Sequence, residues 1–495
     1  MKTILCFLAS LVSLAALASA AVPPMNFVWI IADDMSPDTA AYGLAGVRTP
    51  HLDALAAQGR RYTRAYATAP VCSSSRSAFI LGCSQITTGL HAHDVENPQP
   101  LPAPFEPLPA LLRKAGWFVS NAAAPGTMRN GRAITKGKTH YNFAHDAAVM
   151  FDGDDWRKRR PGQPFFAQFQ ITEPHRPFPI PAAFDPAKLD AIRLPANYPD
   201  HPLMRRDWYA YQHSVEVVDQ RVGAILAQLR EEGVLDQTIV MFFSDHGRPM
   251  PWGKQWLSVE GLHVPLIVRG PGVGAREVEE RLVSLIDLAP SMLRLARLPV
   301  PAWMEGRAVL GGEFPARAHV FAARDRCGDA ADRIRAVIGT DALLVRNFSP
   351  GLPRFNWSSY KEDSYPGLPL LRVLGAAGGL DGLQTQWVAT NRPEFEYYDL
   401  KRDPQGLRNL AADAARTGAM SGLRAALDDW LKATGDRGAL PDPGTEPSLG
   451  EIQAKKRGDY QRTWTRRVGK PEPTDAERLA WWEKSYGLTA KPAQP

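Results

Sequence analysis

The stretch Phe-Val-Trp-Ile-Ile-Ala-Asp-Asp, residues 27–34, is a continuous apolar run that ends in two aspartates. Such a run predicts a strand buried on both faces of a parallel sheet. Similar runs lie at residues 165–171, 238–243 and 264–268, and an amphipathic helical pattern occupies residues 208–232. Strands that alternate with helices predict an α/β fold, here a large mixed, mostly parallel sheet flanked by helices.

The pattern changes after about residue 330. Short strand patterns at residues 335–337, 342–346 and 395–400 are separated by turns rich in Pro and Gly. They predict a smaller C-terminal antiparallel subdomain. From residue 441 onward the chain is polar and carries a pair of tryptophans, which indicates an extension that runs along the surface.

The first 20 residues have the features of a signal peptide. Lys2 precedes an apolar run at residues 4–17, and Ala18-Ser19-Ala20 is the small-x-small pattern that signal peptidase cleaves. The alternative is a membrane anchor, but the run is too short to span a bilayer comfortably. We therefore expect export to the periplasm or the extracellular space, with no membrane span in the mature chain.

The net charge gives only a broad indication of partners. The chain of 495 residues has 58 Lys and Arg against 52 Asp and Glu, a formal net charge of +6. No dense basic run accompanies this excess, so we expect no nucleic-acid partner. An anionic small molecule or a glycan would suit the charge equally well.

Removal of the signal peptide would leave three cysteines, Cys72, Cys83 and Cys327. An odd number in an oxidising compartment leaves at least one thiol unpaired. The simplest interpretation is a Cys72–Cys83 or a Cys83–Cys327 disulfide with one spare cysteine. The alternative is that one of the three is not a structural cysteine.

Acidic residues follow two of the predicted strands directly. Asp33 and Asp34 come after the first strand, and Asp245-His246 comes after the strand at residues 238–243. Because the working site of an open α/β sheet lies outside the carboxyl ends of its strands, we expect these groups to meet. Three carboxylates together repel one another unless a divalent cation neutralises them, and oxygen ligands favour calcium or magnesium. The alternative is that the Asp pair only forms a turn or caps a helix.

Residues 72–82 read Cys-Ser-Ser-Ser-Arg-Ser-Ala-Phe-Ile-Leu-Gly. This segment resembles the Cys-x-Pro-x-Arg segment of the sulfatase family, in the alkaline-phosphatase superfamily, whose cysteine is converted to the aldehyde formylglycine. Other segments resemble the family in the same order, from about residue 26 to about residue 410: residues 33–34, 49–55, 137–140, 174–175, 244–247, 254, 284–290, 398–400 and 403–404.

The resemblance implies an alkaline-phosphatase-like fold and a division of the chain into three parts. These are a signal peptide at residues 1–20, a sulfatase catalytic domain at residues 21–330, and a C-terminal subdomain with its surface extension at residues 331–495.

The resemblance also implies catalytic roles. Residue 72, as hydrated formylglycine, would supply the attacking oxygen, and Arg76 would steady its charge. Lys138 and Lys254 would bind the sulfate oxygens. His175 would protonate the departing oxygen or nitrogen, and His140 would accept a proton when the sulfated form of residue 72 collapses.

A divalent cation is the implied cofactor, calcium by the resemblance and magnesium as the alternative. Its ligands would be Asp33, Asp34, Asp245, His246 and residue 72, although His246 has the alternative of facing the sulfate. The formylglycine-generating enzyme is the implied protein partner.

Two positions depart from the family pattern. Ser74 stands where the family usually has proline, and Leu81 stands where it usually has threonine. Proline would preset the extended backbone that a modifying enzyme grips. Conversion of Cys72 therefore depends on acceptance of serine at position 74.

The substrate is less well indicated. His91, His93 and Arg326, within segments 91–94 and 324–327, and the segment at 360–362 resemble bacterial sulfatases near heparan N-sulfatase. They are candidates for binding a sulfated glycan, as an ester or a sulfamate, with a small aryl sulfate as a surrogate. The alternative is that they are solvated loop residues.

Two other functions stay open. The same fold and nucleophile could serve a phosphonate or phosphate ester hydrolase. If Cys72 stays unmodified, the chain would be a non-catalytic binder of sulfated glycans.

Overall fold

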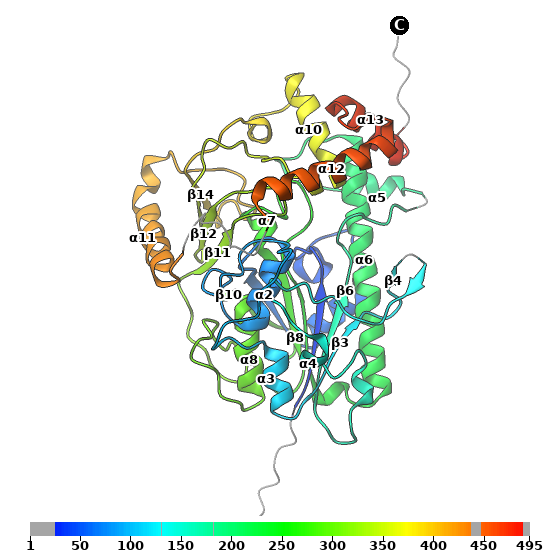
Figure 1. Ribbon diagram of the computed structural model, residues 1–495, viewed down its shortest axis with the longest axis vertical. Helices are drawn as coiled ribbons and strands as arrows, with labels where there is room; N and C mark the ends of the chain where they lie inside the picture. The colour runs from blue at the N-terminus through cyan, green and yellow to red at the C-terminus, as the bar shows by residue number, and fades with distance from the viewer. Residues whose placement is uncertain (1–24, 130, 182, 437–446, 489–495) are drawn as a thin grey trace, which may run out of the picture.

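The computed structural model describes residues 25–129, 131–181, 183–436 and 447–488 (Figure 1). The predicted signal peptide, residues 1–20, lies outside the described residues. One large sheet lies between two layers of helices, and a small antiparallel sheet lies beside it. The predicted fold class is confirmed.

The large sheet has eight strands in the order β10-β2-β8-β7-β1-β6-β3, with β9 paired to β2. β7, β1, β6 and β3 are mutually parallel, whereas β8 is antiparallel to both β7 and β2. The strand predicted at residues 264–268 is therefore the antiparallel member of a mixed sheet. The strands are β1 Asn26–Ala32, β2 Arg60–Tyr66, β3 Phe118–Ala123, β6 Phe165–Ile171, β7 Thr238–Ser244, β8 His263–Arg269, β9 Glu277–Glu279 and β10 Val283–Ser284.

Successive residues of β1 enter two different cores. Val28 and Ile30 pack in the cluster that contains the helices at residues 50–57 and 202–231, whereas Trp29 packs in the cluster that contains the helices at residues 72–81, 108–114 and 288–295. The Trp29 ring meets Phe166 and Phe243 edge-on, each with ring centroids 5.3 Å apart. Because both faces of the strand are buried, its sequence is apolar without alternation.

The helices of these two layers have the following bounds: α1 Pro50–Ala57, α2 Cys72–Leu81, α3 Leu108–Lys114, α6 Pro202–Glu231 and α8 Leu288–Leu295. Shorter elements on the same domain are α4 Ala147–Met150, α5 Pro186–Ala191, α7 Val259–Leu262 and the hairpin β4 Met128–Arg129 and β5 Arg132–Ala133.

The long helix α6 begins before the predicted start at residue 208. Pro202 occupies its first turn, where the missing N–H costs nothing and the fixed φ suits a helix. The predicted apolar stripe, which includes Val215, Val222 and Leu229, is fully buried against the sheet. The stripe was visible in the sequence, whereas the first turns, which include the buried Leu203 and Met204, were not recognised as helical.

The small sheet has the order β11-β12-β13-β14 and is antiparallel throughout. Its face packs against Leu423 and Leu427 of α11. β11 was not predicted, and it belongs to this sheet although it lies before residue 331, the predicted start of the C-terminal subdomain. The division of the chain into domains stays a prediction. The elements are β11 Val320–Arg324, β12 Ile334–Ile338, β13 Ala342–Asn347, β14 Phe395–Asp399 and α11 Thr417–Ala433.

The C-terminal segment is more than a surface extension. It forms helices α12 (Leu449–Val468) and α13 (Asp475–Ser485), which lie across the upper part of Figure 1 against α9 (Ser359–Ser364) and α10 (Gly367–Ala376). α12 and α13 each begin with a capping box. Their buried aromatic residues, Tyr460, Trp464 and Trp482, belong to the same core as α6.

Cys72, Cys83 and Cys327 are all free and buried, so neither of the two disulfides considered from the sequence is present.

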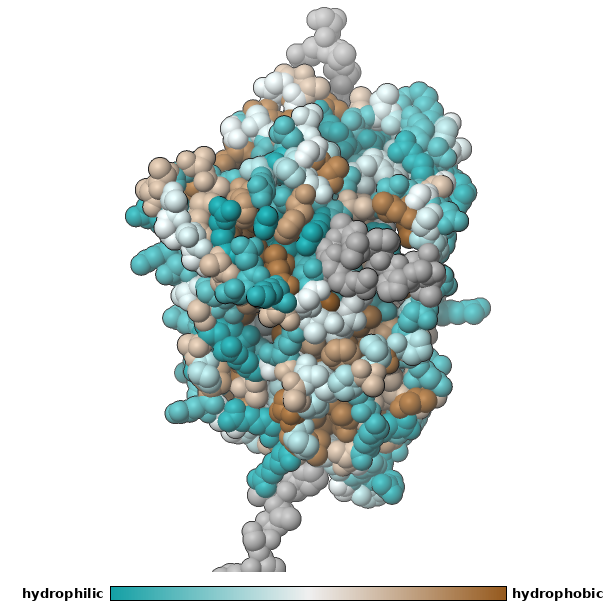
Figure 2. All heavy atoms as spheres, turned by 60° about the vertical axis from the view of Figure 1, so that its left-hand side comes forward, coloured by the Kyte–Doolittle hydropathy of each residue, from teal (hydrophilic) through white to brown (hydrophobic). Residues whose placement is uncertain are grey.

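Hydrophilic and hydrophobic residues are interspersed on the face shown in Figure 2. Within the described ranges, no helix combines the length and apolar character that crossing a membrane requires.

Removal of a buried aromatic side chain tests the packing of α12. Trp464→Ala should weaken this packing by about 3–5 kcal/mol, because a side chain with 0% exposure is replaced by a cavity. Limited proteolysis should then cut α12, and the thermal midpoint should fall. The control is Arg462→Ala on the same helix, whose side chain is 69% exposed and which should change neither. Wild-type protease resistance in Trp464→Ala would contradict this packing.

Candidate active site

The acidic groups meet because β1 and β7 are neighbouring parallel strands. Ala32 is in register with Ser244, so Asp33 and Asp245 leave the sheet side by side. The Asp34 backbone N–H donates to Asp245 Oδ1 at 3.0 Å, and Asp34 adopts a left-handed φ of 65°. The expectation that these groups come together is confirmed by this geometry.

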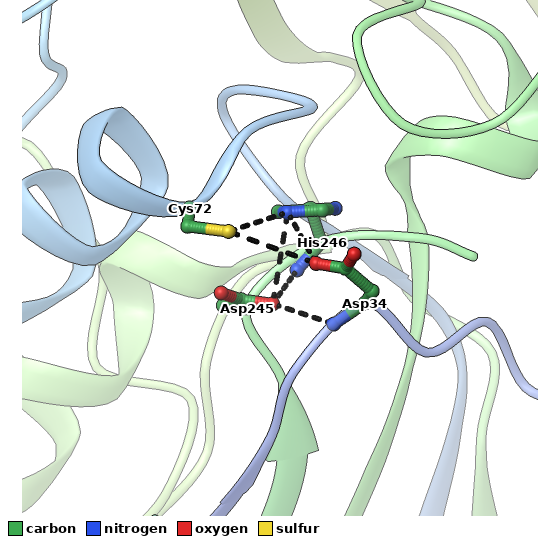
Figure 3. A group of neighbouring side chains, drawn as sticks. All are labelled: Asp34, Cys72, Asp245 and His246. Atoms are coloured by element: carbon green, nitrogen blue, oxygen red, sulfur yellow. Dashed lines mark hydrogen bonds and ion pairs between the residues drawn. The ribbon is translucent and has the colours of Figure 1, made fainter. Parts of the chain in front are cut away.

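Cys72 is the first residue of α2 and is buried beside the acidic groups. Figure 3 shows its side chain pointing toward Asp34, Asp245 and His246. Its Sγ lies 3.3 Å from His246 Nε2 and 3.6 Å from Asp34 Oδ1. Lys254 Nζ lies 3.4 Å from the same sulfur.

Arg76 lies one helical turn after Cys72 and joins two of the carboxylates. Its Nε donates to Asp245 Oδ2 at 2.9 Å and its Nη2 to Asp33 Oδ1 at 2.7 Å. Its third donor, Nη1, bonds Gln170 Oε1 at 2.8 Å. This buried fork of donors fixes the start of α2 against the ends of β1 and β7.

Two lysines neutralise the Asp pair. Lys138 Nζ lies 2.6 Å from Asp33 Oδ2, and Lys254 Nζ lies 2.8 Å from Asp34 Oδ2. Asp34 Oδ1 also lies 3.0 Å from His246 Nε2. The side chains predicted to bind sulfate oxygens therefore bond the predicted cation ligands in this structure.

His175 is held by its own loop. Its Nδ1 donates to the Arg176 carbonyl at 2.5 Å, so Nε2 is the nitrogen left facing the site, 3.8 Å from Asp34 Oδ2. Arg176 is buried and bonds both carboxylate oxygens of Asp207, at 2.9 and 2.5 Å. Tyr486, next to the end of α13, donates to the same carboxylate at 2.8 Å.

His140 bonds a carboxylate outside the acidic cluster, that of Asp94. Its Nε2 lies 2.6 Å from Asp94 Oδ1, and Asp94 Oδ2 lies 3.5 Å from His93 Nε2. His93 is buried, and its Nδ1 shares a hydrogen bond of 2.8 Å with Ser73 Oγ. Both ring nitrogens of His93 therefore face groups of the protein.

The remaining predicted substrate residues lie next to this cluster. The His91 carbonyl accepts a hydrogen bond from Ser74 Oγ at 3.0 Å. Arg326 Nη1 donates to the His93 carbonyl at 3.1 Å. In the segment at 360–362, Lys361 is buried and donates to the Pro251 carbonyl, so it does not reach the site.

The sequence interpretation missed Gln170, and it included Asp94 and Tyr360 only as members of the segments 91–94 and 360–362 considered for sugar contacts. Gln170 and Asp94 bond predicted catalytic residues, and the ring of Tyr360 lies under Lys254 Nζ, with the centroid 5.0 Å away. A polar residue in the otherwise apolar strand at 165–171 was a signal for Gln170. Nothing in the sequence marked the contacts of the other two.

The charges around Cys72 alter its acidity. Burial opposes ionisation of the thiol, but the positive charges of Lys138, Lys254 and His246 outweigh it and hold the pKa of Cys72 well below its usual value. Burial also raises the pKa of the Asp245 carboxyl to about 7, with the charge of Asp33 acting in the same direction. A site with a thiol that ionises readily and several buried carboxylates therefore favours the binding of a cation.

The side chains present fit a divalent cation. Ligand atoms of Asp34, Cys72, Asp245 and His246 all lie within 4.8 Å of one another. The Gly247 carbonyl engages His246 Nδ1 at 3.0 Å, which leaves Nε2 as the ligand nitrogen. Asp33 stands outside this group, because Arg76 and Lys138 hold its oxygens. Carboxylate oxygens suit a hard cation, and three buried carboxylates supply the charge to hold one.

Comparison with known proteins gives a consistent result. A protein-family model described as Sulfatase matches residues 25–298. An ulvan-active sulfatase of Formosa agariphila is 30% identical over 474 residues, covering 84% of this chain and 76% of the relative. The N-sulphoglucosamine sulphohydrolase of Homo sapiens is 28% identical over 472 residues, covering 83% and 91% of the two chains.

The fold is shared more widely. The structure of a phosphonate monoester hydrolase from Silicibacter pomeroyi superposes with a TM-score of 0.59 at 20% identity, covering 83% of this chain and 96% of that one. Similarity at this level shows a common fold.

The charge environment of Cys72 can be measured in the unconverted, metal-free protein. Because its pKa is lowered, Cys72 should ionise to the thiolate at a lower pH than an ordinary cysteine, which is visible in the ultraviolet absorbance of the protein as pH is varied. Lys254→Met should move this transition to higher pH by removing a positive charge. Cys327→Ser is the control and should leave it unchanged, because burial raises the pKa of Cys327. A thiolate signal that survives Cys72→Ser would contradict the assignment.

Proposed function

This chain belongs to the sulfatase family, and from its site we propose that it removes sulfate from a sulfated carbohydrate, using residue 72 as nucleophile beside a divalent cation. The chain is a sulfate ester hydrolase by family, and sulfated carbohydrate is the substrate class of its named relatives. The observation that carries the proposal is the position of Cys72 Sγ at the N-terminus of α2, within 3.6 Å of side-chain atoms of Asp34, His246 and Lys254.

We propose that a formylglycine-generating enzyme, acting with an external oxidant, converts the Cys72 thiol to the aldehyde formylglycine with loss of the sulfur. The hydrated aldehyde would supply an oxygen nucleophile and could release sulfate by returning to the aldehyde. The chain places this residue at a helix N-terminus, where Arg76 and the adjacent lysines stabilise negative charge.

Calcium is our first choice of cation, with magnesium as the alternative; when bound, it would lower the pKa of the nucleophile and attract the sulfate oxygens. Asp34, Asp245 and His246 would hold it, with Asp33 at their edge. Lys138 and Lys254 now neutralise Asp33 and Asp34. A cation on those carboxylates would leave both lysines free to bind the sulfate oxygens.

Two histidines of the site, His175 and His140, suit proton transfer. His175 presents Nε2 to the site, and although burial lowers its pKa, the charge of Asp34 raises it above the usual value. A protonated His175 can donate to the departing oxygen or nitrogen. His140, on the Asp94 side, is our candidate for the second proton transfer.

His91 and Arg326 are our candidates for sugar contacts, because both ring nitrogens of His93 face groups of the protein. The ring of Tyr360, which lies under Lys254, is our candidate for an apolar surface at the site. We also propose that residues 1–20 direct export, because polymeric glycans are met outside the cytoplasm.

A phosphonate or phosphate ester hydrolase is the alternative that the shared fold supports. A phosphate monoester carries about two negative charges at neutral pH where a sulfate ester carries one. The relatives at 30% and 28% identity are named as an ulvan-active sulfatase and an N-sulphoglucosamine sulphohydrolase, whereas the phosphonate hydrolase is 20% identical, which favours the sulfate ester.

Conversion and turnover should occur together. In protein made in its own host, the tryptic peptide of residues 65–76 should carry an aldehyde in place of the Cys72 thiol, measured by mass spectrometry. The same preparation should release sulfate from sulfated glycans and hydrolyse an aryl sulfate faster than the matched aryl phosphonate. Cys72→Ala should lower kcat by roughly 10⁶-fold, the scale seen when a hydrolase loses its nucleophile. An intact thiol together with glycan binding and no sulfate release would instead establish the non-catalytic binder.

Metal removal gives a separate test. A chelator should abolish turnover, and calcium or magnesium should restore it. Asp245→Asn should weaken cation binding by roughly 10²-fold or more, measured by titration calorimetry, because a ligand carboxylate is lost. Asp236→Asn, whose side chain is 90% exposed, is the matched control and should bind the cation as the wild type does. Unchanged binding in Asp245→Asn would place the cation elsewhere.

A further inference from the structure

We infer that Asp94 is a positioning residue for catalysis: its carboxylate fixes the imidazole of His140 beside residue 72, and contacts with Ser73 and His93 hold Asp94 in place. The inference rests on the proposed function, and it assigns a role to a residue outside the matched catalytic set. It also gives His93 a supporting role in place of sugar binding.

The contact between Asp94 and His140 defines the ring. His140 Nε2 lies 2.6 Å from Asp94 Oδ1. Because an ionised carboxylate only accepts hydrogen bonds, Nε2 must carry the proton of this bond. The other nitrogen, Nδ1, is buried and has no hydrogen-bond partner among the described residues. It is therefore the nitrogen available to a reacting group.

Asp94 is in turn tied to the nucleophile segment. Its backbone N–H donates to Ser73 Oγ at 3.1 Å, and Ser73 directly follows Cys72. The same Ser73 Oγ shares a hydrogen bond of 2.8 Å with His93 Nδ1, and His93 Nε2 faces Asp94 Oδ2 at 3.5 Å. The position of Asp94 is thus set by the residue next to the one that reacts.

The backbone conformations of Asp94 and His140 are also unusual. Asp94 and His140 have φ values of 55° and 51°, in the left-handed region that residues other than glycine rarely adopt. Asn142, two residues beyond His140, donates to the carbonyls of Leu90 and Ala92 and joins the two loops. Such conformations persist where the surroundings determine them, and they concentrate at functional sites.

A carboxylate in this position selects the tautomer and orientation of a catalytic histidine. In Ser-His-Asp hydrolases, replacing the Asp by Asn leaves the geometry intact but lowers kcat about 10⁴-fold. The bond here differs in that Asp94 lies at the edge of the site, with its side chain 43% exposed. A change at Asp94 should therefore alter His140 without unfolding the core.

The first test is a double-mutant cycle on aryl sulfate hydrolysis, with rates divided by the converted fraction of residue 72. Asp94→Asn should lower kcat about 10²–10⁴-fold with little change in KM, since proton transfer by a positioned side chain contributes that much. Asp94→Asn with His140→Ala should be no slower than His140→Ala alone. Asp94→Glu, which keeps the charge, should recover part of kcat. Additive effects, or a change confined to KM, would overturn the inference.

The second readout needs no turnover. In ¹⁵N-histidine-labelled, unconverted protein, the hydrogen-bonded imidazole N–H of His140 should give a downfield proton resonance that disappears in His140→Ala and in Asp94→Ala, which leaves no acceptor. Glu216→Gln, which removes a carboxylate 3.7 Å from His213 on α6, is the matched control and should leave the resonance and kcat unchanged. If the resonance depends on Asp94 but no sulfatase activity exists, the proposed function fails while the positioning contact stands. A resonance that persists in Asp94→Ala would overturn the inference whatever the activity.

Discussion

Three buried carboxylates, Asp33, Asp34 and Asp245, lie at the ends of two neighbouring parallel strands. The arrangement of the rest of the site depends on compensating their negative charge. Like charges this close in a buried site are stable only with compensating positive groups. Arg76, Lys138 and Lys254 supply these, each within 3 Å of a carboxylate oxygen. Because the three cations come from α2 and from two separate loops, charge compensation fixes how those segments meet the sheet.

Part of this arrangement could be predicted from the sequence. The apolar run at residues 27–32 marks a strand buried on both faces, and the carboxyl ends of such strands share one edge of a sheet. Asp33 and Asp245 could therefore be placed together from local pattern alone. Cys72 and Arg76 are four residues apart on one helix, so their common face also follows from spacing.

Other features depend on contacts between distant segments, which leave no periodic signal. The direction of β8 is set by its pairing with β2 and β7, since a buried apolar run looks the same in either direction. β11 was missed because five residues ending in Arg324 carry little strand pattern of their own. His93 has the residue type of a ligand-binding group, but its burial and its bonds to Ser73 and Asp94 emerge only from the fold.

The C-terminal helices show how a polar sequence can still bear on chemistry. Asp207 of α6 receives hydrogen bonds from both Arg176 and Tyr486, so it links the loop of His175 to the end of α13. The Arg176 guanidinium also lies over the rings of Phe178 and Tyr365, at 4.1 and 4.5 Å from their centroids. A buried arginine with all these partners has little freedom to move. The orientation of His175, a residue at the carboxyl end of β6, is thus supported by a segment from the far end of the chain.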